Sequence, residues 1–438
     1  MHQGPGFRRR RAFAEFLHHQ STGGILLFAS AVAALVWANG PWKDGYHHLW
    51  EHTVTLTFDE LTLRGTLHHW INDGLMALFF FVVGLELKRE VVGGELSRPR
   101  DALLPVAAGL GGMLMPAVLY LAFNHSGEAH AGWGIPMATD IAFAVGVMSL
   151  LGDRVPTSLK VFLTTLAIAD DLGAVLVIAF FYTSDLSLDN LLIGMAFLAV
   201  LWGGNRLGVR NPWFYAVFGI AGMWTAFLLS GIHATIAGVL AAFTIPAETR
   251  MDEPAFVARI KRHIAAFADL EPNGKPTLSE DQLTVIRHIE VDCERAATPL
   301  QRLEKALHPL VAFGVMPLFA LANAGVELPD DPLGALTSPV ALGVGVGLAV
   351  GKPLGIVLTV LLLVRLGVGR LGNGITRAHL VGMGFLAGIG FTMSLFVNEL
   401  AFADPVLREE AKLGILLASL VAGSIGFLLL RRLPRSSA

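Results

Sequence analysis

Long apolar segments separated by polar connections recur along the whole chain. Most are about 17–25 residues long, the length that a helix needs to cross a bilayer. The pattern therefore predicts an all-α polytopic membrane protein. We expect about twelve transmembrane helices, at residues 23–39, 70–88, 102–123, 134–150, 157–182, 190–206, 212–230, 232–246, 307–324, 339–364, 377–398 and 411–430.

Lysine and arginine positions orient these helices. Cytoplasmic loops carry the excess of both residues, and with the amino terminus inside, the inner connections hold almost all of them. We therefore expect an even number of crossings and the following parts: a cytoplasmic amino terminus at 1–22, spans one to eight at 23–246, a cytoplasmic insertion at 247–306, spans nine to twelve at 307–430 and a cytoplasmic carboxyl terminus at 431–438. A signal peptide is the alternative for the first segment, but its small residues at 29–31 lie within the apolar run, which favours an uncleaved helix.

Two stretches are not transmembrane. Residues 53–63 alternate apolar and polar positions around Asp59 and Glu60, which predicts a β-hairpin on the outer surface. An exposed strand pair favours pairing with a second copy. The insertion at 247–306 is charged and partly helical, and we find no catalytic motif in it.

Composition agrees with the membrane assignment. Hydrophobic residues make up 54% of the chain and charged residues 15%, with a mean hydropathy of +0.60, beyond the range of an ordinary soluble domain. The net charge of -3 is too small to suggest nucleic acid as a partner. A single cysteine, Cys293, excludes a disulfide framework and a cysteine-based metal site.

Two adjacent acids and one lysine lie in the middle of predicted spans. Asp170 and Asp171 occupy the fifth span and Lys352 the tenth. Charge at that depth costs a few kcal/mol per group and usually marks an ion or proton path. Adjacent residues on a helix point about 100° apart, so we expect one acid to pair with Lys352 and the other to face an aqueous cavity. A purely structural ion pair is the alternative for Lys352.

Two spans contain residues that interrupt a helix. In the fourth, Pro136 precedes Thr139 and Asp140, whose side chains can cap a restarting helix and offset the positive end of its dipole. In the eleventh, Gly388 and Gly390 weaken a continuous helix. A simple cap and close helix packing are the respective alternatives. The interrupted spans are each second in a set of three, helices 3–5 and 10–12, which start from opposite faces and so predict inverted repeats.

Three other function classes fit less well. An intramembrane prenyltransferase or aspartyl protease needs a second acid motif that the sequence lacks, and Lys352 has no role in either. A secondary transporter of an organic anion is the alternative to a cation transporter, although the candidate site offers three acids to one lysine. A sensor or scaffold that does not transport could retain all of these residues, and only a flux assay separates it.

The chain resembles the bacterial sodium/proton antiporters of the NhaA type over essentially its whole length. The resemblance is carried, in order, by STGGILLFAS, WINDGLMALFFFVVGLELKRE, MATDIAFAVG, LAIADDLGAV, LHPLVAFGVMPLFALANAGV, GKPLG and GIGFTMSLF. This family combines inverted repeats with broken helices.

The resemblance implies a site as well as a fold. Asp171 is implied as the main ligand of both cation and proton, and Asp170 as its neighbour, between Lys352 and the transported proton. Thr139 and Asp140 are implied where the broken helices cross, so that Na+ would contact Asp171, Asp140 and Thr139. No cofactor is implied beyond the transported ions.

The resemblance also implies an activity. Family members expel Na+ or Li+ from the cytoplasm for a larger number of entering protons, so transport is electrogenic, and it is activated at alkaline pH. We expect one site that holds either ion and opens alternately to the two sides of the membrane. The protein is expected in a bacterial cytoplasmic (inner) membrane, as a homodimer joined through the hairpin.

A charged cluster at the inner face is implied as the pH sensor. Glu86, Arg89 and Glu90 are spaced so that opposite charges can meet on one helical face, and Glu304 and His308 open the ninth span. A plain salt-bridge network is the alternative. The chain departs from the family pattern in its long insertion and at Lys305, where a histidine often stands, which leaves the pH set-point open.

Overall fold

The computed structural model describes residues 5–58, 61–183, 186–270, 277–329, 331–372 and 374–434. Within these ranges the chain is mostly helical, with one small sheet, as the sequence predicts. The elements that follow the sheet on the way to the insertion are α3 Leu67–His69, η1 Trp70–Leu75, α4 Met76–Gly93, α5 Pro99–Phe123, η3 Glu128–Met137, α6 Ile141–Leu150, α7 Thr157–Phe181, α8 Leu188–Arg206, α9 Pro212–Ala216, η5 Val217–Trp224, α10 Thr225–Ser230 and α11 Ala234–Thr244.

The ends of the chain complete the helical body. Before the sheet lie α1 Pro5–Ala38 and α2 Lys43–Glu51. After the insertion lie α14 Pro299–Leu310, η6 Val311–Val315, α15 Met316–Asn323, α16 Pro332–Leu336, α17 Pro339–Val346, η7 Gly347–Gly351, α18 Lys352–Arg365, α19 Arg377–Ala387, α20 Phe391–Ala401 and α21 Pro405–Arg432.

Eight helices among the described residues are long and apolar enough to cross a membrane, or up to ten if each of two bent helix pairs is one span. Two further predicted spans are less apolar or shorter. The run through α4 contains the charged sequence ELKRE near its end, and α11 has only 11 residues. A helix with charges at one end can still bury its apolar part, because long charged side chains reach toward the interface.

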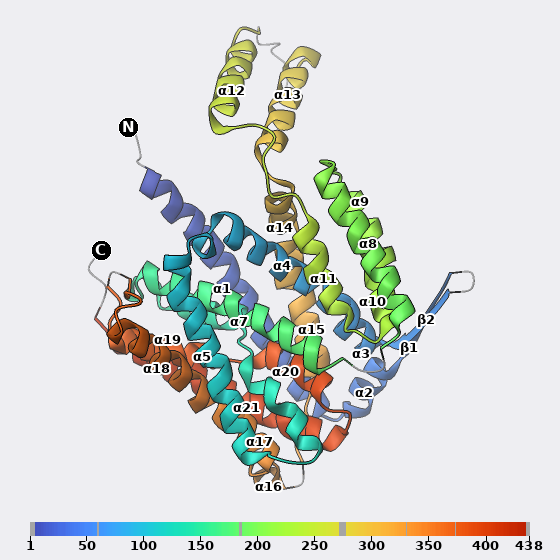
Figure 1. Ribbon diagram of the computed structural model, residues 1–438, viewed down its shortest axis with the longest axis vertical. Helices are drawn as coiled ribbons and strands as arrows, with labels where there is room; N and C mark the ends of the chain where they lie inside the picture. Colours follow the sequence, from blue (N-terminus) through green and yellow to red (C-terminus); the bar gives the residue numbers. More distant parts are fainter. Residues whose placement is uncertain are drawn as a thin grey trace.

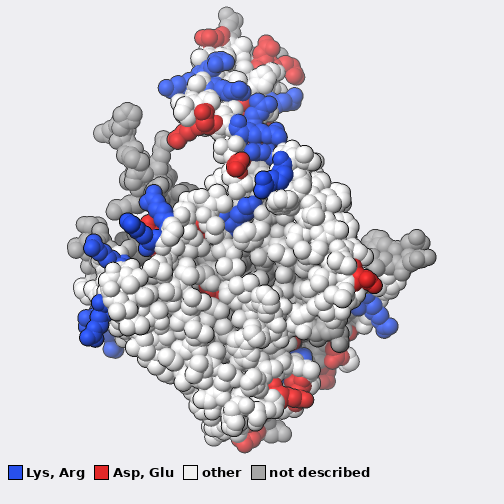
Figure 2. Space-filling view, viewed as in Figure 1, with Lys and Arg blue, Asp and Glu red and all other residues white. Residues whose placement is uncertain are grey.

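The helices pack into one body with two projections (Figure 1). The helices α12 and α13 stand beyond its upper end, and the strands β1 and β2 project from its right side. Figure 2 shows charged side chains gathered on the α12 and α13 projection and near the ends, with a broad uncharged surface between them. Such a surface suits contact with the hydrocarbon of a bilayer.

The predicted β-hairpin is confirmed as a two-stranded antiparallel sheet. Strand β1, Thr53–Phe58, pairs with β2, Leu61–Thr66, from Thr53 opposite Thr66 to Phe58 opposite Leu61. The acids expected in its turn, Asp59 and Glu60, lie outside the described residues.

Small residues allow α4 and α11 to pack closely. A Cβ atom added at Gly84 would lie 3.1 Å from the Val239 Cα atom and 2.8 Å from the Ala242 side chain. Because small residues let helix backbones approach, glycine at this position fits the packing. Lys88 fixes the end of the same contact, donating hydrogen bonds of 2.6 and 2.5 Å to the carbonyls of Phe243 and Ile245.

The insertion forms a helical hairpin from α12, Glu253–Ala268, and α13, Glu280–Ala296. Asp292 is buried between them, with its carboxylate 3.1 Å from His263 Nε2 and 3.4 Å from Arg259 Nη1. Residues 271–276, within the predicted insertion at 247–306, lie outside the described residues.

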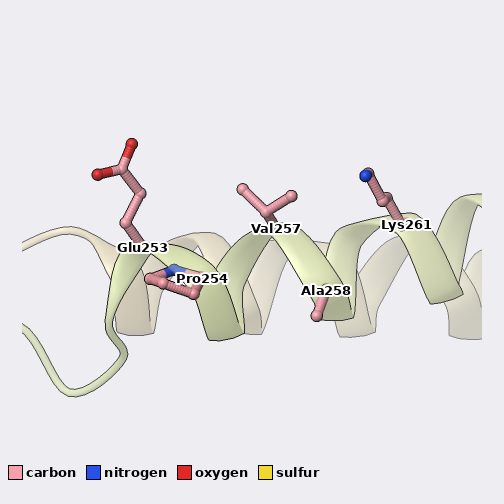
Figure 3. Close-up of a pocket in the computed structure, with 5 residues that line it drawn as sticks. All are labelled: Glu253, Pro254, Val257, Ala258 and Lys261. Carbon is pink, nitrogen blue, oxygen red and sulfur yellow. The ribbon is translucent and has the colours of Figure 1, made fainter.

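A shallow surface hollow lies on the first of these helices. It is lined by Glu253, Pro254, Val257, Ala258 and Lys261, all from α12. Figure 3 shows Glu253, Val257 and Lys261 projecting from one side of the helix. The hollow contains none of the acids predicted to bind ions.

Candidate ion-binding site

Two helical runs are interrupted and meet at their interruptions. The first breaks at residues 138–140, between η3 and α6, and the second at 388–390, between α19 and α20, where the chain bends by 44°. The two breaks contact directly, because the Asp140 backbone N–H donates to the Ile389 carbonyl at 2.7 Å and Thr139 Oγ1 donates to the Ala387 carbonyl at 2.9 Å. Backbone groups freed by each break are therefore partly satisfied by the other.

Close backbone approach explains the glycine at the second break. Gly388 has an ordinary negative φ of -71°, so left-handed geometry is not its role. A Cβ atom there would lie 2.6 Å from the Leu348 carbonyl oxygen, a distance that real Cβ atoms do not reach. Pro136 lies at the end of η3, and its ring faces Gly347 of η7, where an added Cβ would lie 2.7 Å from the proline Cβ.

A fully buried ion pair joins α7 to α18. Lys352 Nζ donates to Asp170 Oδ2 at 2.6 Å, and both side chains have no exposed surface. Lys352 also donates to the Met137 carbonyl at the end of η3. The lysine thus links the first break to one of the two adjacent acids, and its charge is balanced by Asp170.

Asp171 presents a buried carboxylate that lacks such a partner. It is 1% exposed, and its Oδ1 atom has no hydrogen bond within the described ranges. Asp170 leaves one oxygen in the same condition, its Oδ1 atom. Buried polar atoms without partners are rare because each costs about 1–3 kcal/mol or more when charged, so oxygens in this position are suited to a proton or a hard cation.

Asp140 caps both restarting helices. Its Oδ1 accepts from the Phe143 N–H at 2.9 Å at the start of α6, and its Oδ2 accepts from Thr392 Oγ1 at 2.5 Å and from the Thr392 N–H at 3.2 Å at the start of α20. One carboxylate therefore faces the positive ends of two helix dipoles. Both oxygens are already engaged, which leaves Asp140 less free than Asp171 to contact a cation in this conformation.

Sequence reasoning missed two residues of this crossing. Thr392 holds the Asp140 carboxylate, and Ser394 Oγ donates to the Ile135 carbonyl at 2.8 Å, so both hydroxyls of GFTMS tie α20 to the opposite break. The signal was available, because Thr392 follows Gly390 much as Thr139 follows Pro136.

The charged cluster predicted as the pH sensor joins α4 to α14. Arg89 Nε lies 3.0 and 3.1 Å from the two Glu304 oxygens, and Arg89 Nη1 lies 2.8 Å from Glu90 Oε1. Glu86 is half-buried on the same helix and forms no ion pair with the residues that the structure describes. His308 is half-buried one turn beyond Glu304.

No group of three or more His, Cys, Asp or Glu side chains in the described ranges is arranged to hold a metal ion. Hydroxyl and backbone oxygens also lie at the crossing. The Met137 and Ala387 carbonyls at the breaks, and Thr139, are of that kind.

The fold and this site define a multi-pass membrane protein with ionisable groups buried where two broken helices cross. Residues 14–430 match the family model described as Na+/H+ antiporter 1. The chain belongs to this family, which confirms the resemblance seen in the sequence. It is 51% identical to Na(+)/H(+) antiporter NhaA of Oleidesulfovibrio alaskensis over 97% of this chain and 94% of the relative. It is 50% identical to Na(+)/H(+) antiporter NhaA of Acidithiobacillus ferrooxidans, over 97% and 98% of the two chains, and 49% identical to Na(+)/H(+) antiporter NhaA 2 of Syntrophotalea carbinolica, over 97% of each.

Proposed function

We propose that this protein is an electrogenic Na+(Li+)/H+ antiporter of the bacterial inner membrane, activated at alkaline pH. The observation that carries the proposal is the pairing state of the two adjacent acids. Asp170 is neutralised by Lys352, whereas Asp171 keeps a buried oxygen with no hydrogen bond inside the described ranges. Family membership and the names of the relatives support the same ions.

Competition at Asp171 accounts for exchange. A carboxylate at this depth is stable when it holds a proton or a cation, and the two compete for the same oxygens. At low cytoplasmic proton activity Na+ or Li+ binds through Asp171, with Thr139 and Asp140 contributing oxygens after local rearrangement. A proton then displaces the cation from Asp171 on the outer side, and a second proton is held by the Asp170 and Lys352 pair. More than one proton therefore enters for each Na+ expelled, and net positive charge moves inward.

Alternating access accounts for movement between the two sides. We place twelve spans in the membrane with both termini cytoplasmic, and assign helices 3–5 and 10–12 to inverted repeats. In the structure's labels these are α5 to α7 and α17 to α21. Rocking of the repeats against the rest of the body would expose the crossing to one face at a time. The α12 and α13 hairpin is then cytoplasmic and the β-hairpin external, where it joins two protomers.

The Arg89, Glu90 and Glu304 network supports a pH-sensing role for Glu86, Arg89, Glu90, Glu304 and His308. It couples α4 to α14 at the inner face through charged groups, one of which, Glu86, has no ion-pair partner in the described part of the chain. A change in protonation there would alter the balance of charge between two helices that flank the site.

A flux assay tests the proposal. The full chain is reconstituted in liposomes with an internal pH-sensitive dye, and Na+, Li+ or K+ is added over a pH series. We expect Na+ and Li+, but not K+, to drive proton movement, more strongly above neutral pH and faster when a valinomycin-clamped potential favours net charge entry. Absence of a sodium-driven signal at every pH would refute antiport. A signal driven by an organic anion would instead support the alternative, which the acid-rich site does not favour.

A further inference from the structure

A second set of buried charges lies apart from the ion site, where α3, α15, α20 and α21 meet. This is the end of the body at which β2 runs directly into α3 (Figure 1). The buried polar side chains here include Glu399 of α20 and Lys412 of α21. Buried charges in a membrane protein are expensive and are usually functional.

Glu399 is anchored from one side by α21. Its Oε1 lies 3.2 Å from Lys412 Nζ, and its Oε2 lies 3.3 Å from Arg408 Nη1. Lys412 also lies 3.1 Å from Glu409 Oε1. Two acids and two bases thus balance one another, so the cluster needs no bound ion to be neutral.

His68 of α3 approaches the same carboxylate from the other side. Its Nε2 lies 3.0 Å from Asn323 Oδ1 and 3.9 Å from Glu399 Oε2, while Asn72 Nδ2 lies 3.3 Å from its Nδ1. Because the Asn323 amide oxygen can only accept, the proton belongs on Nε2, which then donates to Asn323 and faces Glu399. Burial also lowers the pKa of His68, in agreement with a neutral ring.

This contact crosses the boundary between two parts of the molecule. Glu399, Arg408 and Lys412 belong to the second proposed repeat, whereas α3 and α15 lie outside both repeats. Among the contacts within 4 Å between basic and acidic side chains of the described residues, only that of His68 with Glu399 bridges the repeats and the remaining helices. Directly inside it, Phe396 of α20 packs against Phe80 and Phe319, with ring centroids 5.3 and 6.3 Å apart.

We propose that the contact between His68 and Glu399 is a latch that holds the hairpin-bearing end of the protein closed. For the crossing to open at this end, α20 and α21 must separate from α3 and α15, which moves the Glu399 carboxylate away from His68 Nε2, from which it lies 3.9 Å in the closed contact. The latch rests on the proposed function, since it sets how the protein divides its time between inward-open and outward-open states. His68 and Glu399 are positioning residues and do not touch the transported ion.

The test compares apparent Na+ affinity on the two faces. Loss of the latch increases the outward-open population. The apparent Na+ affinity at each face is proportional to the fraction of protein that is open to that face, so it falls at the inner face and rises at the outer face. In His68→Leu we expect the half-saturating Na+ concentration to rise about fivefold at the inner face, measured in everted vesicles, and to fall at the outer face, measured in right-side-out vesicles. His68→Gln, which keeps a donor and an acceptor, should restore both values. Movement of both values in the same direction, or of neither, would overturn the latch.

A neighbouring histidine provides the matched control. His69 Nδ1 lies 3.0 Å from Asp73 Oδ2, on the same helical run, and does not reach α20. In His69→Leu the half-saturating Na+ concentrations at the inner and outer faces should therefore both equal those of wild type. Should His68→Leu not fold, His68→Asn, which is too short to reach Glu399, serves in its place.

A readout independent of transport separates failure of the latch from failure of the proposed function. Hydrogen exchange followed by mass spectrometry on the purified full chain in nanodiscs should show faster exchange of the α20 amides in His68→Leu than in wild type or His69→Leu. Unchanged exchange in α20 would refute the latch. If wild type shows no sodium-driven proton movement in either vesicle type, antiport is refuted while the exchange experiment still decides whether the contact holds this end closed.

Discussion

Lys352 and Asp170 lie 182 positions apart in the chain and form an ion pair of 2.6 Å with no exposed surface on either side chain. The pair has two consequences. It neutralises Asp170, so that Asp171 is the member of the adjacent pair without a lysine partner. It also ties α18 to both α7 and the break after η3.

Breaking this pair from one side should be costly. In Lys352→Met, Asp170 remains buried without its counter-charge, and removal of one partner of a buried pair typically costs about 3–5 kcal/mol. We expect a clear drop in the thermal unfolding midpoint in detergent, and recovery of most of it in the double variant Lys352→Met with Asp170→Asn. Lys305→Met, at an exposed site on α14, is the control and should unfold like wild type. A double variant no more stable than Lys352→Met would contradict this account.

The charged cluster of Arg89, Glu90 and Glu304 should set the pH dependence of exchange. Glu304→Gln removes the charge that faces Arg89 across α4 and α14, so we expect the pH of half-maximal exchange to move by about half a unit or more, with maximal rate largely retained. Glu294→Gln is the control, because it breaks an exposed pair with Arg302 on the insertion side. Identical pH profiles for Glu304→Gln, Glu86→Gln and wild type would remove the sensor role.

His69, the last residue of α3, should contribute to the stability of the protein in a pH-dependent way. The hydrogen bond to Asp73 raises the pKa of His69 above its ordinary 6.5. A raised folded-state pKa gives a stabilisation that is fully present below the unfolded-state pKa and is lost as pH rises through the folded-state value. The difference in unfolding midpoint between wild type and His69→Gln should therefore be largest below about pH 6 and vanish in mildly alkaline buffer. A difference that grows with pH would contradict the assignment.

The sequence predicts much of this architecture because each signal is local. The length of an apolar run, the alternation around residues 53–63 and the placement of Thr139 and Asp140 after Pro136 depend only on near neighbours. The partner of Lys352 could also be narrowed to two acids, since a buried lysine needs a counter-charge and few acids lie at that depth.

The contacts that the sequence did not predict depend on how helices cross. Thr392 and Asp140 are 252 positions apart, and only the meeting of the two breaks brings the hydroxyl to the carboxylate. The same holds for Asp292, which lies buried against His263 because α12 and α13 fold back on each other. No local pattern specifies which polar residue faces which across such a contact.

Antiport depends above all on Asp171, because this single buried carboxylate is proposed to hold either Na+ or a proton. Sodium-driven proton movement is measured in everted vesicles that contain equal amounts of folded wild type or Asp171→Asn, from neutral to alkaline pH. We expect exchange by Asp171→Asn to fall to the background of vesicles without the protein, at every pH and Na+ concentration. Exchange at the wild-type rate in this variant would show that the cation and the proton bind elsewhere.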